Sequence, residues 1–187
     1  RQAYIVCPLI EETENADLKN VAAYAKTLAE KVFPAYRIAL LHSRLPAIEK
    51  EALMAQFKEG RIDILVSTTV IEVGVDVANA NIMVIENAER FGLSQLHQLR
   101  GRVGRGSEQS YCILFNQSDG ELAKKRMQIL CESNDGFVIS EEDLKLRGPG
   151  DFFGTKQHGL PTLRIANLFS DMDILKEAQQ AASLLQS

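Results

Sequence analysis

The sequence has few of the residues that hold metals or form disulfides. Its three cysteines are an odd number, and no two of them are spaced as Cys-x-x-Cys. Because Cys7 and Cys112 lie within apolar runs, we expect them to be buried free thiols in a reducing, cytoplasmic setting. The three histidines are far apart and form no ligand pattern, so no metal site is expected.

Long apolar runs are also missing. No stretch approaches the length of a membrane-spanning helix and no signal peptide is visible, so no membrane contact is expected. The 187 residues carry a net charge of -4. This balance argues against a globally basic nucleic-acid-binding protein, but a basic groove can lie on an acidic body. Residues 1–4 already enter an apolar run, so we expect a piece of a longer protein.

Apolar runs alternate with helical periodicity along residues 1–118. The runs predict strands over 3–7, 38–41, 62–66, 82–85 and 111–115. Apolar residues spaced three and four apart predict helices over 18–32, 46–57 and 94–100. The second of these is expected to bury Ile48, Leu53 and Phe57. The alternation is typical of an α/β fold with a parallel sheet and helices on both faces.

The pattern changes after residue 118. We expect a helix over 119–133 and a second, short helix that begins at Ser140 and ends at residues 147–150, where glycine and proline stop it. A loop and a closing helix over 172–185 would follow. The sequence therefore predicts a sheet domain over 1–118, and a helical hairpin, loop and C-terminal helix over 119–187.

The segment Gln98-Leu-Arg-Gly-Arg-Val-Gly-Arg105 places three arginines among glycines. Guanidinium groups suit phosphate oxygens, and glycine lets the backbone approach a ligand closely. On a helical turn, Arg102 and Arg105 would share one face and clamp a polyphosphate. A solvated basic turn is the alternative. Ligands of parallel sheets bind where the strands end, and we expect this segment to lie there with residues 42–43 and 67–69.

This segment resembles the Q-x-x-G-R-x-G-R motif of superfamily 2 helicases and translocases. Ser67-Thr-Thr-Val-Ile-Glu-Val-Gly-Val-Asp76 resembles the preceding motif of that superfamily, and His42-Ser-Arg-Leu45 is a looser match to the segment after the second strand. The order of the three along the chain also agrees.

Longer segments narrow the resemblance. Residues 91–105 and 142–159 are similar in kind to the RecG family and to the transcription-repair coupling factors, and the second of them looks like the translocation motif of both. Residues 7–12 and 147–150 favour RecG. The resemblance implies a second RecA-like motor domain plus the translocation motif of a branched-DNA translocase.

The resemblance also implies that the intact enzyme uses ATP and Mg²⁺, both bound mainly by a first motor domain. This sequence has no Gly-Lys pair and hence no phosphate-binding Walker loop, and it has no Asp-Glu pair for the magnesium box. We therefore expect the chain alone to be inactive. By the same resemblance, Arg102 and Arg105 are arginine fingers aligned by Gln98. For Arg100, a bond to the sheet domain and a bond to DNA are both left open.

Four polar residues after the strands are expected to hold DNA phosphates without reading sequence: Thr68, Thr69, His42 and Ser43. Helix capping is the alternative for the threonines, and a satisfied turn for the other two. By resemblance, Gly74 and Asp76 link nucleotide and DNA contacts, with a loop-capping carboxylate as the alternative for Asp76.

In the hairpin region, Arg126, Arg147 and Gln157 match family positions that couple ATP turnover to movement. The alternative for Arg126 is a solvated helix face beside two lysines. The expected partners are the first RecA-like domain and branched duplex DNA, for a monomeric motor in the bacterial cytosol or nucleoid. The other functions that stay open are a coupling-factor motor and a non-catalytic nucleic-acid- or protein-binding module.

Overall fold

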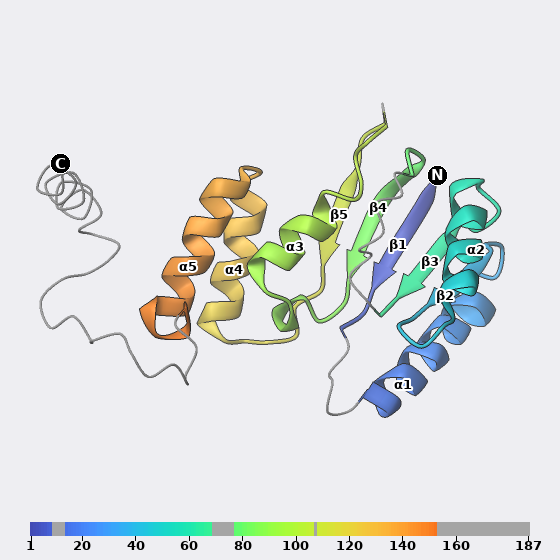
Figure 1. Cartoon of the computed structure of the whole chain (residues 1–187), viewed down its shortest axis with the longest axis horizontal. Coiled ribbons are helices and arrows are strands. Elements are labelled where there is room, and N and C mark those ends of the chain that lie inside the picture. Colours follow the sequence, from blue (N-terminus) through green and yellow to red (C-terminus); the bar gives the residue numbers. More distant parts are fainter. Residues whose placement is uncertain (9–13, 69–76, 107, 153–187) are drawn as a thin grey trace, which may run out of the picture. The chain divides into compact units, whose positions relative to one another are not determined.

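The predicted strands form one parallel sheet. The computed structural model describes residues 1–8, 14–68, 77–106 and 108–152. The strands are β1 (Gln2–Val6), β2 (Ile38–Leu41), β3 (Ile64–Ser67), β4 (Ala80–Ile85) and β5 (Tyr111–Leu114). Their order is β2-β3-β1-β4-β5, and every pairing is parallel (Figure 1). The predicted α/β fold class is confirmed.

Three helices flank the sheet in the predicted places: α1 (Glu14–Thr27), α2 (Ala47–Lys58) and α3 (Leu93–Arg100). A π-helical turn, η2 (Leu28–Val32), extends α1, and a short 3-10 helix, η3 (Ala88–Arg90), precedes α3. The prediction that α2 buries Ile48 is wrong, since its side chain is 80% exposed. Only one side of α2 faces the sheet, and there Phe57 is fully buried.

The strands place alternate side chains in two apolar cores, one on each face of the sheet. On one face, Tyr4 and Val6 of β1 pack in a cluster that includes buried residues of α2 and α3. On the other face, Ile5 and Cys7 pack with buried residues of α1. Helices therefore cover both faces, as the sequence predicted.

Parallel pairing gives the sheet two different ends. We call the side where the strands begin, at Gln2 and Ala80, the amino end, and the side where they finish, at Val6 and Ser67, the carboxyl end (Figure 1). Each connection leaves from the carboxyl end and must return to the amino end before the next strand starts. The two ends therefore carry different parts of the sequence.

The predicted hairpin consists of α4 (Glu121–Glu132) and α5 (Gly136–Phe152). α5 begins four residues earlier than predicted because Asp135, and not Ser140, caps it: the N–H of Phe137 donates to Asp135 Oδ1 at 2.8 Å. The predicted end at residues 147–150 is also wrong, since α5 continues to Phe152. Proline removes one hydrogen bond from a helix, which can bend the helix without ending it.

The chain divides into two compact units, Arg1–Gly148 and Pro149–Ser187. The first unit holds both the sheet and most of the hairpin. Compactness does not test the functional division after residue 118, which stays a prediction. The predicted loop and closing helix lie outside the described residues. None of the helices in the described ranges has the length and apolar character needed to cross a membrane.

Candidate nucleotide and nucleic-acid sites

The Gln98–Arg105 segment begins as a helix and ends as an irregular turn. α3 ends at Arg100, and Gly104 adopts a φ of 83°, a backbone conformation that glycine takes without a steric penalty. The prediction that Arg102 and Arg105 share a helical face is therefore wrong, because the helix ends before both.

Both of these arginines reach the surface of the turn. Arg102 is half-buried, whereas Arg105 is exposed and its Nε donates to the carbonyl oxygen of Gly101 at 3.2 Å. Gln98 is exposed on α3. Guanidinium groups beside a glycine-rich backbone are suited to a phosphate group.

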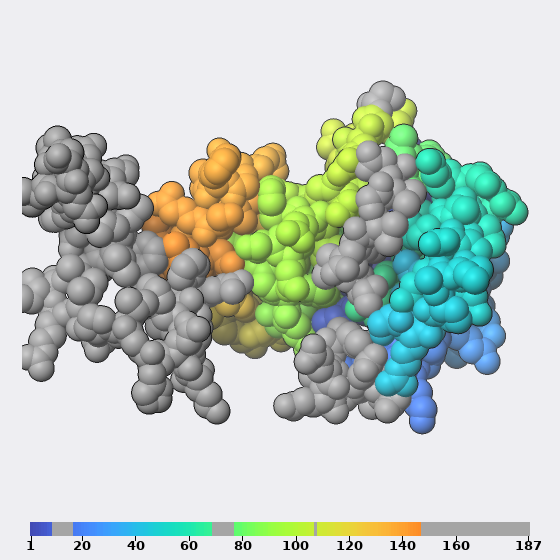
Figure 2. All heavy atoms as spheres, in the orientation of Figure 1, coloured from blue at the N-terminus to red at the C-terminus, as the bar shows by residue number. Residues whose placement is uncertain are grey.

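This arginine turn, residues 101–106, lies at the amino end of the sheet. A Cβ atom on Gly106 would come within 2.6 Å of the carbonyl oxygen of Ala78, just before β4. Figure 2 shows the connection into β5, in yellow-green, projecting from this end. The prediction that the turn joins the polar residues after β2 and β3 is wrong. α3 carries the chain back to where the strands begin.

Two buried polar atoms follow neighbouring strands at the carboxyl end. Leu41 of β2 pairs with Ser67 of β3, so His42 and Thr68 follow the two strands as neighbours, and the N–H of Thr68 donates to the oxygen of Leu41 at 3.2 Å. His42 Nδ1 and Thr68 Oγ1 have no hydrogen-bond partner within the described residues. A buried polar atom without a partner costs about 1–3 kcal/mol, so each of these atoms would gain from a hydrogen bond to a ligand or to a residue outside the described ranges.

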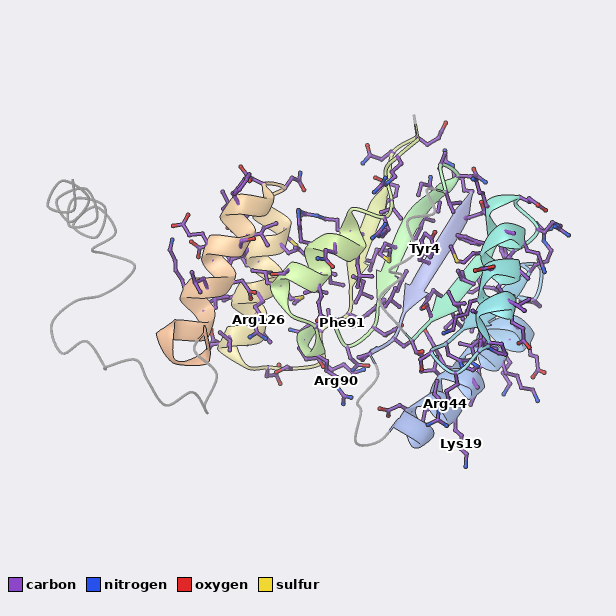
Figure 3. The ribbon with its side chains drawn as sticks, viewed as in Figure 1. Tyr4, Lys19, Arg44, Arg90, Phe91 and Arg126 are labelled. Atoms are coloured by element: carbon purple, nitrogen blue, oxygen red, sulfur yellow. The ribbon has the colours of Figure 1, made fainter. Side chains whose placement is uncertain are left out.

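Basic side chains also lie at the carboxyl end of the sheet. Lys50 Nζ donates to the backbone oxygen of Ser43 at 2.6 Å, within the turn after β2. Figure 3 shows Lys19, Arg44 and Arg90 along the carboxyl end of the sheet, on α1, the β2–α2 connection and η3. Cations spread along one side of a domain suit a polyanion such as a nucleic-acid backbone.

Arg126 differs from the neighbouring lysines of α4. Lys124 and Lys125 are exposed, whereas Arg126 is half-buried and its Nε lacks a hydrogen-bond partner within the part of the chain that the structure describes. Arg126 is therefore not simply part of a solvated helix face.

Five predicted positions lie outside the described residues: Thr69, Gly74, Asp76, the side chain of Arg147, and Gln157.

Arg100 contacts the hairpin, a partner that the sequence did not suggest. Its Nη1 donates to the backbone oxygens of Leu130 and Ser133 at 2.6 and 2.8 Å, and its Nη2 lies 2.9 Å from His97 Nδ1. Both oxygens are at the C-terminal end of α4, where carbonyl groups lack helical donors. Spacing along the sequence could not show this contact, because Leu130 and Arg100 are 30 residues apart.

A pocket of about 270 Å³ opens beside the carboxyl ends of β1 and β4. The Tyr24 hydroxyl group donates to Glu86 Oε1 at 2.7 Å, and burial together with this bond raises the pKa of Tyr24. Burial raises the pKa of Cys7 to about 12, so its thiol stays protonated near neutral pH. Asp17 and Arg90 also line the pocket, and their opposite charges define no single class of ligand.

Across the described ranges, no group of three His, Cys, Asp or Glu residues could hold a metal ion.

A parallel five-stranded sheet with helices on both faces is the fold of a RecA-like helicase C-terminal domain. The chain belongs to the helicase conserved C-terminal domain family, whose model matches residues 1–107. A second family model, described as ATP-dependent DNA helicase RecG, domain 3, C-terminal, matches residues 133–186.

Individual relatives agree with both matches. The chain is 57% identical to the ATP-dependent DNA helicase RecG of Synechocystis over 99% of its own length and 22% of that protein. It is 53% identical to the RecG of Thermotoga maritima over 96% of its length and 23% of that protein. A structure of RecG bound to a three-way DNA junction is 50% identical, with a TM-score of 0.70 over 93% of this chain and 22% of that one. The predicted resemblance to RecG is confirmed, and the chain spans under a quarter of these relatives.

Proposed function

We propose that this chain is the second RecA-like motor domain, with the adjoining hairpin, of an ATP-dependent DNA helicase of the RecG type. The intact protein would remodel replication forks and Holliday-type junctions in recombination and repair. The observation that carries this proposal is the 57% identity to a RecG helicase over 99% of the chain. The side chains at the two ends of the sheet also support the proposal, because one set suits the phosphates of ATP and the other suits the phosphates of a DNA backbone.

At the amino end, we propose that Arg102 and Arg105 bind the phosphoryl group that is transferred from ATP. Gln98 would align the interface between the two motor domains. Guanidinium groups on a surface turn fit this role. When bound, ATP would supply the free energy for movement through its hydrolysis. ATP and Mg²⁺ would be held mainly by a first motor domain outside this chain, and Gly74 and Asp76 would link that site to DNA.

At the carboxyl end, we propose that four residues bind the backbone of duplex DNA: His42, Ser43, Thr68 and Thr69. The buried atoms His42 Nδ1 and Thr68 Oγ1 would gain hydrogen bonds from this contact. Contacts of this kind hold phosphates and read no bases, so we expect little sequence specificity. Arg126, Arg147 and Gln157 would couple ATP turnover to movement along the duplex.

The function is tested by strand separation. With ATP, the intact protein should separate the strands of a forked duplex, whereas residues 1–187 alone should hydrolyse no ATP until the first motor domain is added. An intact protein that binds forked DNA but never turns over ATP would instead be a non-catalytic binding module. Displacement of RNA polymerase without strand separation on forked DNA would indicate a transcription-repair coupling factor.

We further propose that the intact protein is a monomeric motor in the bacterial cytosol or nucleoid.

A further inference from the structure

Arg100 links the helix that carries the arginine turn to the hairpin. Its guanidinium group donates to two carbonyl oxygens at the C-terminal end of α4, those of Leu130 and Ser133, at 2.6 and 2.8 Å. A cation at this end of a helix supplies missing donors and is favoured by the helix dipole. Two bonds from one planar group also fix the direction of approach, which a single bond would not.

Helix α3 contacts the other side of the hairpin turn as well. A Cβ atom on Gly136, the first residue of α5, would lie 3.1 Å from His97 Nε2. The imidazole ring of His97 also lies 2.9 Å from Arg100 Nη2, through its other nitrogen. The ring is thus enclosed between the Arg100 guanidinium and the backbone of α5. We call these five residues the α3–hairpin joint: His97, Arg100, Leu130, Ser133 and Gly136.

A third contact ties α3 to α5. Asp143 is only 6% exposed, and the Ser94 hydroxyl group donates to its Oδ2 at 3.2 Å. The hairpin is therefore held at both ends of α3, near Ser94 and near Arg100. Such an arrangement lets α3 and the hairpin move as one body.

The opposite side of the joint is the arginine turn. The N–H of Gly101 donates to the oxygen of His97 at 3.0 Å, and the N–H of Arg102 donates to the oxygen of Leu99 at 2.9 Å. Arg102 is therefore hydrogen-bonded to the last turn of α3, two residues from the guanidinium group that holds the hairpin. A displacement of the turn must displace the end of α3.

We propose that Arg100 is a positioning residue that transmits movement of Arg102 and Arg105 to the hairpin through the α3–hairpin joint. The inference rests on the proposed function, in which those two arginines respond to ATP. Arg100 touches neither nucleotide nor DNA in this role. It acts because its two bonds join α3 to the end of α4, so that the arginine turn and the hairpin belong to one contiguous network of contacts.

The test uses the intact protein with four variants: Arg100→Met, Arg100→Lys, Gly136→Ala and, as a matched control, Arg61→Met. Arg61 is 61% exposed and pairs with Glu59, away from the joint. The readout is the number of base pairs separated per ATP hydrolysed on a forked duplex, with the melting temperature measured alongside. Arg100→Met should lower this ratio on the order of tenfold while DNA-stimulated ATP hydrolysis continues.

The other variants separate positioning from simple packing. Lysine is a point donor and cannot form the planar pair of bonds, so Arg100→Lys should restore only part of the ratio. Gly136→Ala should lower the ratio from the hairpin side by crowding His97, even though alanine favours a helix more than glycine does. Arg61→Met should leave the ratio unchanged.

Equal losses of ATP hydrolysis and strand separation in Arg100→Met would overturn the inference, since Arg100 would then be only a helix cap. An unchanged ratio in Arg100→Met and Gly136→Ala would overturn it too. The proposed function fails separately, if the Arg105→Ala protein still hydrolyses ATP at the wild-type rate. The two ideas can therefore be rejected independently.

Discussion

The two ends of the sheet differ in how their polar groups are satisfied. At the amino end, Arg105 is exposed and hydrogen-bonds backbone within its own turn. At the carboxyl end, His42 Nδ1 and Thr68 Oγ1 are buried, and no partner for them exists within the described residues. A guanidinium group that interacts with charge developing in the transition state raises the rate of reaction, whereas a hydrogen bond to a buried atom that lacked one stabilises the bound complex. We therefore expect the amino end to affect rate and the carboxyl end to affect affinity.

The largest expected effect is that of Arg105→Ala in the intact protein. Removing one arginine finger should lower the kcat of DNA-stimulated ATP hydrolysis on the order of a thousandfold, since that charge stabilises the transferred phosphoryl group. Steady-state turnover at saturating forked DNA measures it. The exposed Arg61→Ala variant serves as the control. A turnover unchanged in Arg105→Ala would remove this residue from the active site.

Gly106→Ala tests whether the arginine turn must lie against β4. A methyl group there meets the backbone oxygen of Ala78 at 2.6 Å, and backbone cannot rotate away as a side chain can. We expect a loss of about 1–3 kcal/mol in the free energy of unfolding, measured by chemical denaturation. Gly101→Ala is the matched control, because its Cβ would meet its nearest atom at 3.4 Å, an ordinary contact. Equal stability of the two variants would contradict the placement of the turn.

Thr68→Val probes the carboxyl end with a change that keeps the side-chain shape. In the absence of DNA, the variant should be as stable as the wild type or more stable by about 1 kcal/mol, because it removes a buried hydroxyl group that has no partner among the described residues. Its Kd for forked DNA at fixed salt should rise about tenfold, the effect of one lost hydrogen bond to a phosphate.

The control for that measurement is Thr27→Val, which removes a hydroxyl group that donates to the Ala23 oxygen at 2.9 Å on α1. It should leave the Kd unchanged. A loss of stability in Thr68→Val without any change in Kd would show that Thr68 is a structural cap.

The smallest effect concerns a pair at the amino end that serves stability alone. Hydrogen bonds from Arg37 hold the pKa of Asp63 down at about 2. A depressed carboxyl pKa stabilises the fold fully above the unfolded pKa of about 3.9, and this contribution is lost as the pH falls through the folded pKa of about 2. Asp63→Asn should cost under about 1 kcal/mol at pH 7, because Arg37 is largely exposed. The difference from the wild type should vanish below pH 2, as thermal unfolding would show.

The sequence was sufficient for the strands and most helices, because burial on both faces of a parallel sheet leaves a pattern that depends only on local residues. It failed where the outcome depends on distant contacts. The extent of α3 and the φ of Gly104 separate Arg102 from Arg105, and no spacing rule indicates either. Ile48 has an apolar side chain in a helical pattern but lies on the outer side of α2.

The candidate sites were predictable in composition but not in arrangement. The residue types at 42, 68, 102 and 105 indicated phosphate chemistry, whereas their division between two ends of the sheet follows from the direction in which α3 returns. The bonds of Arg100 and the pocket beside Tyr24 join segments that are far apart in the sequence. Such contacts become visible only once the chain is folded.

The division of labour between the two ends is tested most directly by measuring kcat at saturating forked DNA and Kd for that DNA in Arg105→Ala, Thr68→Val and the double variant of the intact protein. We predict that Arg105→Ala changes only kcat, that Thr68→Val changes only Kd, and that the double variant shows both changes at their single-variant size. A Thr68→Val protein with a strongly reduced saturated kcat, or an Arg105→Ala protein with equally weakened DNA binding, would contradict the separation of the two ends.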